Sequence, residues 1–334
     1  MEEMALEIVP DKQADKAVQL ALVAEQNGFS NVWITDHYNH HGVWPILSAI
    51  ALRTSNILLG PGVTNPYTMN PCAISSSIAT IQEMSQERAI LGLGAGDKST
   101  LESIGITRRR PVTAIREAVE IIRHLLSGER VTKEGSVFST NNAGLNLELK
   151  TIGDGGIDIY VGAQGPQMLK TASMIADGIL LNASHPRDVE AARKIITAVL
   201  QEGNRDSESL KFVCYSSFCL LNEEEQIPLE TRVVVAYIVA GSSERVLERH
   251  GIDVGKKKAI KTNLQKGDYA SATKAVTGDM IESFAVVGSP DECISRIREL
   301  AKVGIDQFVV GSPIGTKKQE TIGRIGEEII PQIT

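Results

Sequence analysis

One acidic residue stands in the middle of an apolar segment near the N-terminus. Residues 5–9 read as a buried strand, and Glu7 is their single charged residue. An unpaired buried carboxylate is costly, and burial favours its protonated form. A carboxylic acid held protonated can act as a general acid near neutral pH. Glu7 is therefore a candidate proton donor, and a structural ion pair inside the protein is the alternative.

Two further acidic residues directly follow short apolar segments. Asp36, with His37 beside it, follows residues 31–35, and Asp97 follows residues 89–93 through Gly94-Ala95-Gly96. If the strands are parallel and close into a barrel, their carboxyl ends meet at one rim, where barrel ligands bind. We therefore expect these acids and Glu7 to converge on one pocket. For Asp97 the alternative is capping of the helix that follows.

Three histidines in one loop, His37, His40 and His41, raise the question of a metal site. Their spacing fits neither the HExxH pattern nor a zinc finger. We therefore expect no metal. Arg108-Arg109-Arg110 could hold an acidic part of a ligand, although an exposed run of charges is more often only solvated.

Glycine-rich segments follow several of the same apolar runs. Gly60–Tyr67 holds two glycines and two prolines, so it can continue neither as a strand nor as a helix. It is a candidate ligand floor or an ordinary loop. Gly162 and Gly165 precede a helix and could present backbone N–H groups to a phosphate, with a tight loop as the equal alternative. Gly92–Gly96 lacks the spacing of a dinucleotide fingerprint, so we exclude a Rossmann site.

The elements that must position these residues alternate along the chain. Eight short apolar runs are each followed by a helical pattern; they are residues 5–9, 31–35, 56–59, 89–93, 157–161, 178–181, 212–221 and 307–310. This alternation predicts a (β/α)8 barrel, an α/β fold, with a doubly wound open sheet as the alternative. We expect one barrel domain over 1–334 with a mostly helical insertion at 223–283, after the seventh strand. Residues 128–156 show no sustained period, and we find no tandem hairpin signal.

Composition narrows the classes of function. The chain has 334 residues, a formal net charge of −7 and 4% aromatic residues, which argues against nucleic acid or an anionic membrane as partner. The four cysteines form no C-x-x-C pair, which is typical of reduced thiols in the cytoplasm. No signal peptide or membrane-spanning run is evident. We expect a cytoplasmic protein that acts on a small molecule.

Several segments together match one family. The chain resembles the methylenetetrahydromethanopterin reductases, which belong to the bacterial-luciferase-like barrel superfamily, and the resemblance covers nearly its whole length. The matching segments are Trp33–Asn39, Gly60–Tyr67, Gly92–Lys98, Gly162–Pro166, Asn182–Pro186, Glu248–Gly251 and Gly311–Gly315. The sequence Gly-Pro-Gly-Val-Thr-Asn-Pro-Tyr within them is specific to this family rather than to barrels in general.

The resemblance implies an activity and a cofactor. The family reduces 5,10-methylenetetrahydromethanopterin to the methyl form, reversibly, with the reduced deazaflavin coenzyme F420 as hydride donor, in the one-carbon metabolism of methanogenic archaea and their relatives. A homo-oligomer, a dimer or a tetramer, is expected. The alternatives are another luciferase-like oxidoreductase that depends on F420 or a flavin, and a flavin-binding barrel without catalytic activity.

The resemblance also assigns site residues. It implies that the Gly62–Val63 peptide bond is cis and forms a bulge behind the deazaflavin ring. Glu7 matches the candidate acid of the family, with Asp97 as a second candidate that could protonate the departing nitrogen of the substrate. The implied cofactor-binding residues are Asp36, His37, Gly62, Val63, Thr64, Asn65, Gly94, Gly96, Asp97, Gly162, Ala163, Gln164, Gly165, Asn182 and Ala183.

Overall fold

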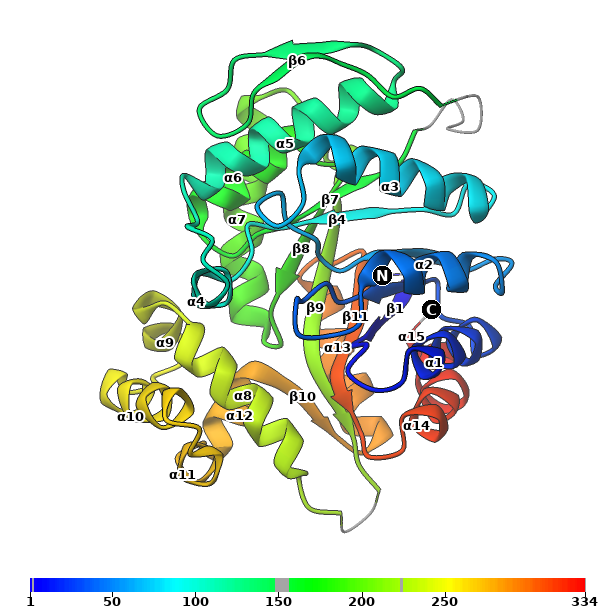
Figure 1. The fold of residues 1–334 in the computed structure, drawn as a ribbon. Coiled ribbons are helices and arrows are strands. Elements are labelled where there is room, and N and C mark those ends of the chain that lie inside the picture. Colours follow the sequence, from blue (N-terminus) through cyan, green and yellow to red (C-terminus); the bar gives the residue numbers. More distant parts are fainter. Residues whose placement is uncertain (2, 148–155, 223–224, 334) are drawn as a thin grey trace.

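Eight parallel strands form the centre of the molecule (Figure 1), described by a computed structural model for residues 1, 3–147, 156–222 and 225–333. The strand order is β3-β2-β1-β11-β9-β8-β7-β4, and bridges from Leu59 to Ala89 and from Thr64 to Leu93 join the two ends. All eight predicted strands are confirmed. They are β1 (Glu3–Ile8), β2 (Asn31–Ile34), β3 (Leu58–Pro61), β4 (Leu91–Leu93), β7 (Ile159–Gly162), β8 (Gly178–Asn182), β9 (Lys211–Leu220) and β11 (Gln307–Ile314).

Helices surround the barrel and bury their apolar faces against it. The start of α3 is set by local chemistry, because Asn70 accepts a hydrogen bond from the Cys72 N–H and Pro71 occupies the first turn. Ser289 and Glu292 form a capping box at the start of α13. The helices are α1 (Ala14–Gln26), α2 (Val43–Ala51), α3 (Pro71–Met84), α4 (Lys98–Ser103), α5 (Pro111–Leu126), α6 (Pro166–Ile175), α7 (Pro186–Glu202), α13 (Pro290–Lys302), α14 (Lys318–Arg324), a π-helical turn (Ile325–Ile329) and α15 (Ile330–Ile333).

Five more described helices follow β9 and precede α13 in the chain. They are α8 (Leu229–Gly241), α9 (Glu244–Arg249), α10 (Val254–Gln265), α11 (Tyr269–Lys274) and α12 (Gly278–Phe284), and they gather at one side of the barrel (Figure 1). Their buried side chains form an apolar cluster of their own. The predicted insertion 223–283 begins at residues 223 and 224, which lie outside the described residues. No described helix combines the length and the apolar character that crossing a membrane requires.

The structure differs from the sequence prediction in two places, and the first is a hairpin. β5 (Val131–Lys133) and β6 (Thr140–Ala143) form an antiparallel hairpin where no hairpin was expected. Its turn is held from a distance, because the Glu117 carboxylate accepts hydrogen bonds from the backbone N–H groups of three residues, Ser136, Val137 and Phe138. Such a contact leaves no local sequence pattern. The segment 128–156, in which the sequence shows no sustained period, also includes residues 148–155, which lie outside the described residues.

The second difference is a strand at the end of the helical insertion. β10 (Ala285–Gly288) follows α12 without a break and pairs in parallel with β9, from Ala285 opposite Ser217 to Gly288 opposite Leu220. Four residues are too few to show a period of their own beside a helix. β10 extends the sheet where β9 runs beyond the barrel.

The barrel interior is filled in layers. Ala5, Trp33, Ile90, Tyr160, Leu180, Val213 and Val309 form a buried cluster inside the strands. Because side chains alternate between the two faces of a strand, the residues two places further on also point inward. These are Glu7, Thr35, Gly92, Gly162, Asn182, Tyr215 and Gly311. The upper layer is therefore a mixture of glycines and polar residues, and it forms the floor of the site.

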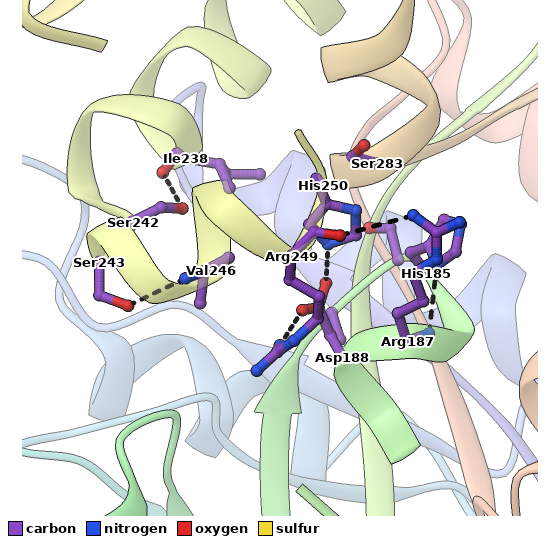
Figure 2. Close-up of polar contacts among 12 residues, drawn as sticks. His185, Arg187, Asp188, Ile238, Ser242, Ser243, Val246, Arg249, His250 and Ser283 are labelled. Atoms are coloured by element: carbon purple, nitrogen blue, oxygen red, sulfur yellow. Dashed lines mark hydrogen bonds and ion pairs between the residues drawn. The ribbon is translucent and has the colours of Figure 1, made fainter. Parts of the chain in front are cut away.

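A polar clasp ties the helical insertion to the barrel helices (Figure 2). The Asp188 carboxylate, at the start of α7, forms an ion pair with Arg249 and accepts a hydrogen bond from His250 at 2.7 Å. The His250 side chain is 1% exposed and its ring meets the edges of the His185 and Phe284 rings. Arg249 and His250 belong to the matched segment Glu248–Gly251, so this segment serves the contact between the insertion and the barrel.

Removing the acid of this clasp should loosen the insertion. In Asp188→Ala, the buried imidazole and the Arg249 guanidinium lose their acceptor, so we expect the free energy of unfolding to fall by about 2–3 kcal/mol. Amide hydrogen exchange in α8–α12 should rise more than in the barrel strands. Glu190→Ala is the matched control, because Glu190 is exposed on the same helix and should change stability by no more than about 0.5 kcal/mol. Equal losses in both variants would contradict the clasp.

Candidate active site

A cavity of about 930 Å³ opens at the carboxyl ends of the barrel strands. This volume is at the upper end of the range for small-molecule sites. All but two of the predicted cofactor residues lie in its wall, which includes Asp36, His37, Gly62, Val63, Asn65, Gly94, Gly96, Asp97, Gly162, Ala163, Gln164, Gly165 and Asn182. Thr64 and Ala183 are buried behind the wall. The strand ends thus bring together residues that are up to 146 positions apart, from Asp36 to Asn182.

A bulge after β3 forms the back of this cavity. The Gly62–Val63 peptide bond is cis, as the family resemblance implies. The Val63 side chain packs toward the glycines of neighbouring strands: an added Cβ would lie 2.5 Å from Val63 Cγ2 at Gly94, 3.1 Å from Val63 Cγ1 at Gly92 and 3.8 Å from Val63 Cγ2 at Gly162. Glycine is needed at Gly94 because a side chain there would occupy the space that Val63 fills. The result is an apolar patch of Val63, Gly94 and Gly162 in the cavity wall.

Thr64 connects the bulge to its neighbours. Its N–H donates to Gly92 O at 3.0 Å, and its carbonyl accepts from the Gly94 N–H at 2.8 Å. Its hydroxyl donates to Asp36 Oδ2 at 2.7 Å. Burial raises the pKa of Asp36, although the hydrogen bond from Thr64 and the nearby His37 partly oppose this. Thr64 therefore acts beneath the cavity wall, where it fixes the position of Asp36.

Asp97 is engaged by the helix that it precedes. Its Oδ1 accepts hydrogen bonds from the Thr100 N–H at 2.8 Å and the Ser99 hydroxyl at 2.5 Å, so it is the N-cap of α4. Burial alone would raise its pKa, but these hydrogen bonds and the charge of Arg108 together lower it. These contacts are those of a helix cap, which was the alternative interpretation of Asp97 from the sequence. An acid whose pKa is lowered is ionised near neutral pH, which argues against Asp97 as proton donor.

Glu7 lies beside the cavity rather than in its wall. Its Oε2 accepts the Ser312 N–H at 2.6 Å and its Oε1 accepts the Thr35 hydroxyl at 3.1 Å. No described basic side chain forms an ion pair with it, so the alternative of a structural ion pair does not apply to the described contacts. Tyr215 is next to Glu7 and lines the cavity. The alternation of side chains along β9 could have indicated Tyr215 from the sequence, but no motif marks it.

The loop after β2 supplies the rest of the rim. His37 Nε2 lies 3.3 Å from the Thr100 hydroxyl, and the His37 and His40 rings are 5.3 Å apart. Burial and the nearby His37 lower the pKa of His40, although Asp11 and Glu7 oppose this. Among the described residues, no group of three or more metal-ligating side chains converges.

Arg108 is the member of the basic triplet that reaches the site. Its Nη1 donates to Gly96 O at 2.8 Å, and Arg108 lines the cavity. Asn65 Oδ1 accepts hydrogen bonds from the N–H groups of Tyr67 and Thr68 in a tight turn. The side-chain NH2 group of Asn65 takes no part in these bonds and can donate to a ligand. The wall also includes residues outside the predicted set of cofactor-binding residues. Besides Arg108, they are Tyr38, Thr68, Ala95, Thr100, Leu101, Ile104, Pro111, Val112, Pro166, Gln167, Met168, Leu180 and Tyr215.

A second hollow of about 290 Å³ adjoins the main cavity. The two share Gln164, Gly165, Pro166 and Asn182, at the end of β8 and the start of α6. Ala183 lines this second hollow. Helices α8 and α9 of the insertion form its far side, so the clasp at Asp188 also fixes this part of the site.

Comparison with known proteins agrees with this geometry. A sequence profile of the family described as luciferase-like monooxygenase matches residues 4–307. Proteins named 5,10-methylenetetrahydromethanopterin reductase from Archaeoglobus fulgidus and Methanolobus tindarius are 45% and 43% identical, over 98% and 97% of this chain and 98% of each relative. The solved structure of the coenzyme F420 dependent tetrahydromethanopterin reductase from Methanopyrus kandleri has a TM-score of 0.93 at 41% identity, with 99% of both chains covered.

The packing of Val63 leads to a test by substitution. Gly94→Ala places a methyl group 2.5 Å from Val63 Cγ2, and such overpacking should lower the free energy of unfolding by about 1–3 kcal/mol. Val63→Ala in the same chain removes Cγ2 and leaves Val63 Cβ as the nearest atom of that side chain, at 3.6 Å. The double variant should therefore lose less stability than the sum of the two single variants.

Gly241→Ala is the control for this experiment, because no atom other than those of the adjacent residues and the backbone of α8 lies within 4 Å of the added Cβ among the described residues. It should unfold like the unmodified protein in urea. Strict additivity of Gly94→Ala and Val63→Ala would show that the two side chains do not compete for the same space.

Proposed function

Since the chain belongs to the luciferase-like family and, within it, to the 5,10-methylenetetrahydromethanopterin reductases, we propose that it reduces 5,10-methylenetetrahydromethanopterin to the methyl form, reversibly, with reduced coenzyme F420. The observation that carries the proposal is identity of 43–45% over nearly the whole chain together with one large cavity at the barrel rim. The matched segments of the sequence supply most of the wall of that cavity.

The residues of the cavity fit a deazaflavin. A planar tricyclic ring needs an apolar surface free of protruding groups, and Val63, flanked by Gly94 and Gly162, offers one. Its polar edge needs hydrogen-bonding partners, and Asp36, Asn65 and Gln164 are available in the wall. The reduced deazaflavin supplies the hydride when it is bound.

The opening of α6 supports binding of an anionic group. Gly165 is the N-cap and Pro166 the first residue of this helix, and both lie where the two hollows meet. Backbone N–H groups in the first turn of a helix have no partner within the helix and favour negative charge. We assign Gly162, Ala163, Gln164 and Gly165 to this task, while Asn182 and Ala183 form the adjoining wall.

The proton that the reaction needs is assigned to Glu7. The one-carbon bridge of the substrate opens when one of its two nitrogens departs, and this step requires a proton on that nitrogen. Glu7 supplies it and becomes a carboxylate. Its position is fixed by Ser312 and Thr35, which satisfy both oxygens. Asp97, ionised in the cavity wall, stabilises the positive charge that develops on the substrate.

Location and assembly belong to the same proposal. Free cysteines, three of them buried, suit a reducing cytoplasm. The expected homo-oligomer, a dimer or a tetramer, can be measured by light scattering on the purified protein. The proposed partner in catalysis is a small molecule, with no nucleic acid and no membrane.

The activity is tested by following the oxidation of reduced coenzyme F420 in the presence of the methylene pterin. Loss of the reduced coenzyme that depends on the pterin is the expected result. Binding of flavin mononucleotide, without binding of F420, would instead favour a flavin-dependent oxidoreductase. Binding of F420 without turnover would favour a barrel that only holds the coenzyme.

The role of Glu7 is tested by Glu7→Gln, which keeps the shape of the side chain and removes the acid. We expect unchanged F420 binding and at least tenfold slower turnover, about 1.4 kcal/mol of transition-state stabilisation. Glu3→Gln is the matched control, because Glu3 lies on the same strand at the opposite end of the barrel and pairs with Lys211. Turnover of Glu7→Gln close to that of the control would remove Glu7 from the acid role.

A further inference from the structure

Tyr215 occupies a distinctive position in the upper layer of the barrel. It lies on β9, two residues after Val213, which belongs to the buried interior cluster. Its side chain packs partly against that cluster and also lines the main cavity. Glu7 interacts with Thr35, Ser312, His40 and Tyr215, and only Tyr215 among these described neighbours is part of the cavity wall.

The Tyr215 hydroxyl is buried, and it makes no hydrogen bond of good geometry to a described residue. Glu7 and Thr35 are nevertheless within reach of loose hydrogen-bond contacts with this hydroxyl, and these contacts act on its ionisation. An unpaired buried hydroxyl costs about 1–3 kcal/mol, so a position of this kind calls for a reason.

The phenol is held in its neutral form. Burial raises the pKa of Tyr215 well above its ordinary value, and Glu7 raises it further whenever Glu7 carries its negative charge. A neutral phenol keeps its proton and can donate one hydrogen bond. The Glu7 oxygens already accept from Ser312 and Thr35, and a carboxylate can accept more than two hydrogen bonds.

We propose that Tyr215 is a positioning residue for the proposed reaction, on which this inference rests: its hydroxyl stabilises the Glu7 carboxylate that forms when Glu7 gives up its proton. The proton moves from Glu7 to the departing nitrogen of the substrate, and Tyr215 keeps its own. Before this step the hydroxyl has no hydrogen bond of good geometry to a described residue, and during it the neighbouring Glu7 becomes a charged acceptor. An interaction that becomes stronger toward the transition state accelerates the reaction.

Other titratable groups near Glu7 could also change the activity with pH, so their effect must be distinguished from that of Tyr215. His40, on the loop after β2, interacts with Glu7, and its own neighbours are His37, His41 and Asp11. The pKa of His40 is lowered, so it is neutral near pH 7 and changes charge only under more acidic conditions. Ser312 and Thr35 face Glu7 without titrating. An effect of Tyr215 on the alkaline side of the pH profile is therefore separable from His40.

The test is Tyr215→Phe, which removes one oxygen atom and keeps the ring in the cavity wall. We expect kcat to fall about tenfold, with F420 affinity and thermal unfolding unchanged. Without the donor, the ionised form of Glu7 is less stable, so the loss of activity with rising pH should occur at higher pH. Replacement of Tyr215 by a difluorinated tyrosine, a stronger donor, should shift this loss to lower pH.

Tyr160→Phe is the matched control. Tyr160 also faces the barrel interior, with its ring 5.3 Å from that of Trp33, but it lies one layer below and does not line the cavity. It should keep the kcat and pH profile of the unmodified protein. Normal kcat in Tyr215→Phe, or a lower kcat with an unshifted pH profile, would overturn the proposal. Absence of turnover in the unmodified protein would instead refute the proposed function.

Discussion

The close approach of Val63 to the neighbouring strands is the constraint on which the site depends. The bulge after β3 reaches into the barrel rim only because Gly92, Gly94 and Gly162 leave room for the Val63 side chain. This packing sets the backbone of the next residue, and Thr64 then pairs with Gly92 and Gly94 across the seam between β3 and β4. The hydroxyl of Thr64 in turn positions Asp36. One packing contact thus couples closure of the barrel to the shape and polarity of the cavity.

The three acids of the site are separated by their surroundings. Burial raises the pKa of Asp36, whereas donated hydrogen bonds and Arg108 lower that of Asp97. Glu7 lies apart from both, beside the cavity, where it accepts two hydrogen bonds and has the buried hydroxyl of Tyr215 as a neighbour. Groups of one chemical type can therefore serve different tasks, because each is held in a different balance of burial and hydrogen bonding.

The helical insertion contributes to the site through its attachment. Asp188 contacts two consecutive residues at the end of α9, Arg249 and His250 (Figure 2). The His250 ring also lies 5.1 Å from the His185 ring and 5.3 Å from the Phe284 ring, measured between centroids. The attachment places α8 and α9 over the second hollow, which shares its border at Gly165 with the main cavity. The wall of the second hollow thus depends on the contact between Asp188 and His250, which are about sixty residues apart in the chain.

Local sequence patterns determined the barrel strands and most of the residues at the rim. The alternation of short apolar runs with helical patterns predicted all eight barrel strands, since each run must bury both faces, and glycine-rich ends marked the rim. Asp36 and Asp97 could be predicted as site residues because each follows an apolar run, and the carboxyl ends of barrel strands meet at one rim. The activity and the cis bond at Gly62–Val63 came from the resemblance of whole segments to a known family, since no single residue type indicates either.

Only the tertiary structure decided the contacts that join distant residues. The hairpin at β5 and β6 depends on Glu117, nearly twenty residues earlier, and the clasp depends on Asp188 and His250. Asp97 proved to be a helix cap, and Glu7 proved to lie beside the cavity with Tyr215 next to it. A sequence shows which side chains are available, but hydrogen-bond partners, burial and the resulting pKa shifts arise from residues that meet only in the folded chain.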